Sequence, residues 1–100
     1  MKMIATDEDV QIVGALLRID VSDENEIIIK QYVSSAEKFL ENAGCTVDYS
    51  DARIMDAVSM YVGKRYDDPE GAKDSAGEVT SLVSLIEQIR QSQAKESDAS

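Results

Sequence analysis

The chain has no histidine and a single cysteine, Cys45, among its 100 residues. Histidine is the usual general base and a frequent metal ligand, and without it a lone cysteine has no partner to activate it as a nucleophile. One cysteine also excludes an intramolecular disulfide and a zinc site built from several cysteines. The sequence has no phosphate-binding loop, GxGxxG fingerprint or nucleophile elbow. We therefore expect a protein that is not an enzyme, with no catalytic residue and no cofactor.

Positive charge is scarce, since ten Lys and Arg stand against twenty Asp and Glu for a formal net charge of −10. A DNA-binding surface needs clustered cations to neutralise phosphates, so we expect no sequence-specific DNA binding. The simplest explanation of the acidic excess is solubility. The acidic residues gather at expected helix starts, where the helix dipole favours them, and their spacing matches no EF-hand loop. We therefore expect no metal site.

Long apolar runs are absent as well. No run approaches the roughly eighteen residues that a membrane-spanning helix needs, and the opening MKMIATDEDV lacks the apolar stretch of a signal peptide. We expect a cytosolic protein without membrane contact. The length fits one small domain whose core is only just large enough to fold alone, so association with copies of itself or with a partner is expected.

The strongest pattern that is present is an amphipathic segment over residues 23–43. Its apolar side chains fall within an arc of roughly 140° on a helical wheel. They are Ile28, Ile29, Tyr32, Val33, Ala36, Phe39, Leu40 and Ala43. Lys30 and Glu37 fall on the opposite, polar face. Ser22 or Asp23 can cap the first turn and Gly44 can close the last one, so we predict a long helix at the centre of the fold.

Three further segments repeat with the helical period. The first covers residues 7–17 and starts with the capping-box spacing of Thr6 and Asp9. The second covers residues 51–66. The third begins with a capping box at Ser75 and ends near residue 90. The predicted fold is therefore all-α, a small bundle of about four helices with a long central helix.

Two residues stand out within these segments. Gly14 lies in the middle of a predicted helix, where glycine costs about 1 kcal/mol relative to alanine, so it either permits a close backbone approach or is held by packing. Arg65 falls within the apolar stripe of the segment at 51–66. At the last helical turn its charge favours the negative end of the dipole, so we expect its stem to reach outward rather than form a buried ion pair.

The last helical segment has a wide apolar stripe, of which a four-helix core can use only part. We therefore predict an oligomer interface formed by Leu82, Leu85, Ile86, Ile89 and Arg90. After residue 90 no large apolar side chain follows. Residues 1–90 are predicted to form the helical domain, and residues 91–100 a disordered, flexible polar tail.

Four stretches of sequence follow one another in an order that resembles a known family. They are LLRID at residues 16–20, IIIKQYVSSAEKFLENAGC at 27–45, IMDAVSMYVGKRYDDPE at 54–70 and LVSLIEQIR at 82–90. Together they resemble the head-tail connector (adaptor) proteins of tailed bacteriophages, and the resemblance covers roughly residues 7–90.

The resemblance implies a structural virion protein at the head-tail junction, present in the host cytoplasm before assembly. Such a subunit forms a homo-oligomeric ring, dodecameric in the virion, beneath the portal protein. The ring extends the DNA channel and offers a platform to the next head-completion or tail protein, while the closing helix engages the portal. DNA passes without sequence-specific binding, and an acidic wall suits this role because it repels phosphates.

Two other functions remain open on the sequence alone. The net charge of −10 also fits an acidic inhibitor that mimics DNA and occupies the basic groove of a nuclease or repressor. Such a mimic needs carboxylates in two spaced rows, whereas many acids here gather at helix starts. A generic helical interaction domain is the third possibility.

Overall fold

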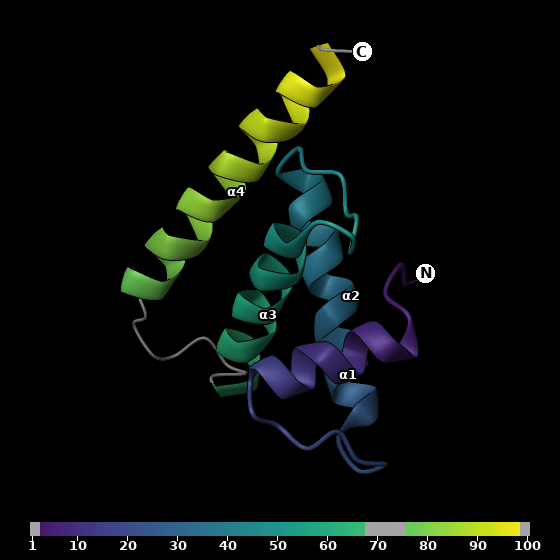
Figure 1. The fold of residues 1–100 in the computed structure, drawn as a ribbon. Helices are drawn as coiled ribbons and strands as arrows, with labels where there is room; N and C mark the ends of the chain where they lie inside the picture. The colour runs from purple at the N-terminus through teal and green to yellow at the C-terminus, as the bar shows by residue number, and fades with distance from the viewer. Residues whose placement is uncertain (1–2, 68–75, 99–100) are drawn as a thin grey trace.

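The computed structural model describes residues 3–67 and 76–98, and in these residues it contains helices and no strand. The helices are α1 (Asp7–Leu16), α2 (Glu26–Asn42), α3 (Ala52–Asp67) and α4 (Ala76–Asp98) (Figure 1). The prediction of a small all-α bundle is confirmed. None of the described helices is long and apolar enough to cross a membrane.

The centre of the bundle is α3, which packs against α1, α2 and α4. Figure 1 shows α2 and α3 side by side, with α1 crossing them and α4 alongside α3. The long helix predicted over residues 23–43 is present as α2, with 17 residues, but α4 packs mainly against α3 and not against α2 as expected. The central position of α3 is explained by the small side chains of Ala57 and Ser59, which are buried and let neighbouring helices approach.

The predicted capping box at the start of α1 is confirmed. The Thr6 hydroxyl accepts a hydrogen bond from the Asp9 backbone N–H at 3.2 Å, and the Asp9 carboxylate accepts one from the Thr6 N–H at 2.9 Å. The helix ends at Leu16, and Arg18, two residues later, has a φ of 58°. This left-handed conformation lets the Ile19 N–H reach the Gly14 carbonyl at 2.8 Å, which closes the last turn.

Gly14 permits a close approach between α1 and the connection that follows it. A Cβ at this position would lie 2.5 Å from Val21 Cγ2 and 3.1 Å from the Ile19 carbonyl oxygen. Of the two explanations for a glycine in the middle of this helix, the close backbone approach is therefore the correct one.

The start of α2 differs from the prediction. The helix begins at Glu26, because the Asn25 side chain first closes a turn: its oxygen accepts from the Ser22 N–H and its amide donates to the Asp20 carbonyl, both at 2.8 Å. The end of α2 is as predicted. Gly44 has a φ of 92°, so α2 closes through the hydrogen bond from the Cys45 N–H to the Leu40 carbonyl at 2.9 Å.

The buried face of α2 is turned around the helix axis relative to the predicted stripe. Ile28 is 49% exposed and Phe39 40% exposed, although both were expected in the core. Glu37, expected on the polar face, is only 4% exposed. The cause is the segment before α1, which packs on the Glu37 side of α2 and leaves the opposite side uncovered.

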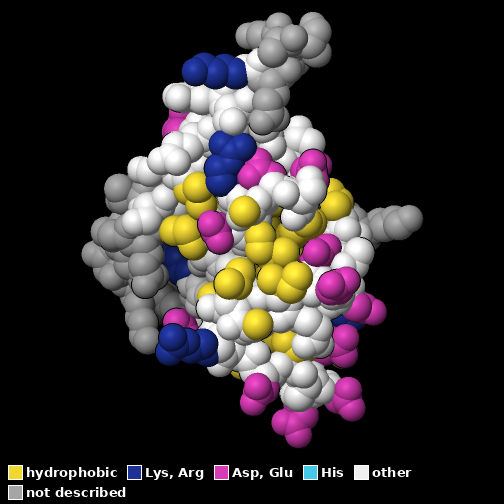
Figure 2. Space-filling model, viewed as in Figure 1, with side chains coloured by type: hydrophobic (Ala, Val, Ile, Leu, Met, Phe, Trp, Pro, Cys, Tyr) yellow, Lys and Arg dark blue, Asp and Glu magenta, His cyan; other side chains and the backbone are white. Residues whose placement is uncertain are grey.

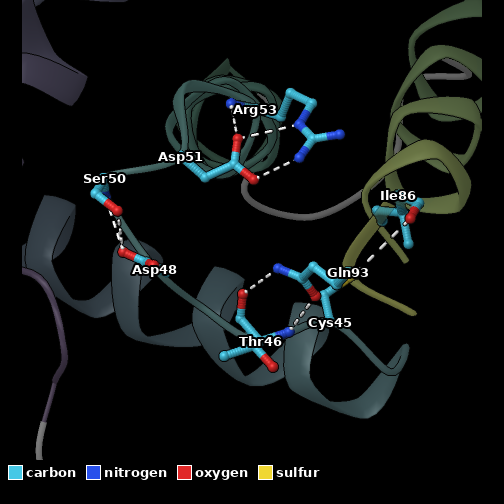
Figure 3. A network of polar contacts seen from close by, with 8 residues as sticks. All are labelled: Cys45, Thr46, Asp48, Ser50, Asp51, Arg53, Ile86 and Gln93. Carbon is cyan, nitrogen blue, oxygen red and sulfur yellow. Dashed lines mark hydrogen bonds and ion pairs between the residues drawn. The ribbon is translucent and has the colours of Figure 1, made fainter. Parts of the chain in front are cut away.

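The polar segment after residue 90 continues α4 to Asp98, so the predicted irregular tail is wrong for residues 91–98. Gln93 helps to hold it there, because its side chain accepts from the Thr46 N–H at 2.8 Å and donates to the Thr46 carbonyl at 2.9 Å (Figure 3). The predicted capping residue Ser75 and the last two tail residues, 99 and 100, lie outside the described residues.

Candidate interaction surfaces

The structure places most of the predicted interface of α4 inside the monomer. Leu82, Ile86 and Ile89 are buried, with exposed fractions of 7%, 6% and 0%. Leu85 is half-buried against the core, and Arg90 is exposed and paired with Glu87 at 2.6 Å. Only Leu85 and Arg90 of the five therefore offer surface to a partner while the fold is intact.

Leu85 lines a groove of about 390 Å³ that runs between α1, α3 and α4, which we call the α4 groove. Its lining residues are Leu16, Leu17, Asp56, Ser59, Met60 and Leu85. Four of these lining residues are apolar, whereas Asp56 and Ser59 are polar. The α4 groove is thus a largely apolar surface that the monomer leaves open.

A second uncovered surface runs along the junction of α2 and α3. We call it the aromatic seam and define it as Ile28, Tyr32, Phe39, Tyr61 and Arg65. The Phe39 and Tyr61 rings lie with their centroids 5.4 Å apart. The Arg65 guanidinium lies 5.3 Å from the centroid of the Tyr32 ring and 6.0 Å from that of Tyr61.

The local helix geometry explains why these side chains meet. Ile28 and Tyr32 are four residues apart on α2, and Tyr61 and Arg65 are four residues apart on α3, so each pair shares one helix face. Arg65 Nη1 also lies 3.3 Å from the Tyr61 hydroxyl oxygen, to which it donates a hydrogen bond. The prediction that Arg65 reaches outward is confirmed, and the two ring faces hold its charge in place.

The cation of the seam has no carboxylate partner among the described residues. The ion pairs of the described residues join Lys30 to Asp7 and Glu26, Arg53 to Asp51 and Arg90 to Glu87. Neither Arg65 nor the exposed Lys38 takes part in any of them. Among the described residues, the aromatic seam therefore combines exposed aromatic rings with a cation that forms no ion pair.

Acidic side chains collect at another part of the molecule, the connection from α1 to α2. Figure 2 shows them at the lower edge of the view, where this connection lies in Figure 1. Asp23 and Glu24 are exposed, and none of the described ion pairs includes them. Ile27 follows directly and is 78% exposed, more than any other large apolar side chain in the described residues. We call these three residues the acidic knob.

Glu37 is the one buried carboxylate in the described part of the chain. Its two oxygens accept hydrogen bonds from the backbone N–H groups of Ile4 and Ala5, both at 2.9 Å, and from the Tyr49 hydroxyl at 2.6 Å. Burial, followed by the bond to Glu37, raises the pKa of Tyr49 well above its usual range, so Tyr49 stays protonated as the donor. Glu37 thus fastens the N-terminal segment and the connection after α2 to the core.

Groups with chemical reactivity are few in the described residues. No three or more Asp, Glu or Cys side chains there are grouped so that they could hold a metal ion. Cys45 is buried and free, with its sulfur 3.8 Å from the Ile86 carbonyl oxygen (Figure 3). Burial raises the pKa of the Cys45 thiol, which lowers the fraction of reactive thiolate.

Sequence reasoning placed Arg65 correctly but missed the seam around it, because Ile28 and Phe39 were assigned to the core. The polar character of Glu37 gave no sign of its burial.

The chain was also compared with known proteins. No family model, no curated protein and no solved structure matches it.

Proposed function

We propose that this chain is a structural subunit that acts by binding copies of itself and neighbouring proteins, in the manner of a phage head-tail connector. The observation that carries the proposal is the aromatic seam, where Phe39 and Ile28 are 40% and 49% exposed and Arg65 forms no ion pair with a described residue. Aromatic and arginine side chains are enriched where proteins bind one another. Exposing these apolar side chains to water does not stabilise the monomer.

The assembly we propose is a ring beneath a portal protein, dodecameric in the virion. The α4 groove, with Leu85 and Arg90 near it on the same helix, is our candidate contact with the portal or with the next head-completion or tail protein. The net charge of −10 suits a channel through which DNA passes without binding. The resemblance in sequence supports the phage assignment, and the two open surfaces support the more general role.

The net charge also determines how association depends on salt. Two copies with centres about 30 Å apart repel by on the order of 10 kcal/mol in water without salt. An exposed ion pair between them contributes only about 0.2–1 kcal/mol. Salt at physiological strength shortens the screening length to about 8 Å and removes most of the long-range repulsion. Association through an apolar seam should therefore strengthen as salt rises.

Sedimentation velocity tests this proposal. We expect monomer at low concentration in about 20 mM salt, and larger species as the concentration and the salt rise toward about 300 mM. A chain that stays monomeric at millimolar concentration across this range, yet binds a basic nuclease or repressor tightly, would be a DNA mimic instead. A steady loss of association with salt would also contradict the proposal.

A further inference from the structure

We infer that the aromatic seam of one copy receives the acidic knob of the next copy, so that subunits join head to tail. This inference rests on the proposed self-association and names the surfaces that carry it. The aromatic seam is the receiving surface, centred on Phe39, Tyr61 and Arg65. The acidic knob is Asp23, Glu24 and Ile27 at the start of α2.

The residues of the aromatic seam favour binding of a surface that is both acidic and apolar. Arg65 is held over two ring faces and has no carboxylate partner in the described residues. On a helical wheel of α2, the residues that flank the seam on its exposed side are Gln31, Ser35, Lys38 and Asn42, and none of them is acidic. Along this described flank of α2, a partner that brings carboxylates therefore meets Lys38 and no carboxylate.

The chain itself carries an occupant of this kind. Ile27 is 78% exposed and follows directly after Asp23 and Glu24, two exposed carboxylates. A branched apolar side chain with two adjacent acids matches the aromatic rings and guanidinium of the seam and the ammonium of Lys38 on its flank. Ile27 would pack on the Phe39 and Tyr61 rings, and the carboxylates would reach Arg65 and Lys38.

The position of the two surfaces requires the contact to be between copies. Ile27 and Phe39 are twelve residues apart on one helix, a separation of about 18 Å, so a copy cannot pack its own Ile27 on its own Phe39 ring. A symmetric contact of seam against seam would bring Arg65 and Lys38 of both copies together, and like charges in an interface disfavour it. Two copies joined head to tail still have one free seam and one free knob, so further copies can add. A ring forms if the rotation from each copy to the next closes.

Two complementary variants test this inference in the full chain. Arg65→Glu disables the seam and leaves the knob, whereas Ile27→Lys disables the knob and leaves the seam. Lys95→Glu and Val83→Lys are the matched controls, because they make the same kind of change at exposed positions of α4, away from both surfaces. Lys38→Glu, on the exposed flank of the seam, is a second variant in case Arg65→Glu alters the fold, which circular dichroism checks.

We expect each single variant to weaken self-association by about tenfold or more, as interface arginines and central apolar residues do. The controls should sediment like the unaltered chain. An equimolar mixture of Arg65→Glu and Ile27→Lys should form a complex that stops at the heterodimer, because only one intact knob and one intact seam can meet.

The outcomes separate this inference from the proposed function. If the unaltered chain assembles and both variants assemble equally well, the assigned surfaces are wrong while the structural role stands. If each variant is monomeric and their mixture is monomeric too, the contact is not head to tail. If the unaltered chain never self-associates but binds acidic polyglutamate through Arg65, the occupant is another acidic protein, and both the inference and the proposed ring fail.

Discussion

Replacing Glu37 with alanine should lower the free energy of unfolding by about 2–4 kcal/mol, because the change leaves several hydrogen-bond donors without an acceptor. These donors are the N–H groups of Ile4 and Ala5 and the hydroxyl of Tyr49. A loss of this size corresponds to a fall in Tm of roughly 10–20 °C for a domain of this length. Urea unfolding and thermal melts measure it, and amide exchange at residues 4 and 5 should accelerate.

The neighbouring Glu41 supplies the matched control. It lies one turn further along α2 and is exposed, so Glu41→Ala should change stability by no more than about 0.5 kcal/mol. Tyr49→Phe should cost about 1 kcal/mol, and its effect should shrink when Glu37 is already alanine, because the two residues share one hydrogen bond. Equal effects of Glu37→Ala and Glu41→Ala would show that the buried carboxylate does not fasten the N-terminal segment.

Truncating Ile89 should destabilise the monomer rather than only its assembly. Ile89 is fully buried between α4 and the rest of the core, and Ile→Ala at such sites costs about 2–5 kcal/mol. That is a large share of the roughly 5–15 kcal/mol that stabilises a domain. Denaturant unfolding at low protein concentration, where association is absent, isolates the effect on the fold.

Val83 is the control for this second prediction, since it lies on the same helix and is 50% exposed. Val83→Ala should leave the unfolding free energy within about 0.5 kcal/mol. If Ile89→Ala unfolds at the same denaturant concentration as the unaltered chain but no longer assembles, Ile89 belongs to an interface and its burial in the monomer has been misjudged.

Helical periodicity was sufficient to predict the four helices of the described residues and the approximate limits of α1, α2 and α3. It could not place the buried face of α2, because that depends on partners far away in sequence. Glu37 bonds to Ile4 and Ala5, more than thirty residues earlier. No pattern local to α2 carries that information, so Glu37 was assigned to solvent and Phe39 to the core.

The same limit explains two points on which α4 differs from the expectation. Gln93 was assigned to a polar tail because no apolar residue accompanies it, yet it bonds to the backbone of Thr46 on a distant connection. A stripe of Leu82, Ile86 and Ile89 shows that a helix face is buried, but not whether the monomer or a partner buries it. Arg65 was placed correctly, because its position in the last turn of α3 is a local signal.

Electron microscopy of the negatively stained protein tests the central claim, that this chain is a subunit which assembles with copies of itself. The sample is the full chain at high concentration in about 0.3 M salt, where long-range repulsion is screened. We predict closed rings whose formation is lost in Arg65→Glu and kept in Lys95→Glu. A field of monomer-sized particles alone, in protein that circular dichroism shows to be helical, would contradict the account.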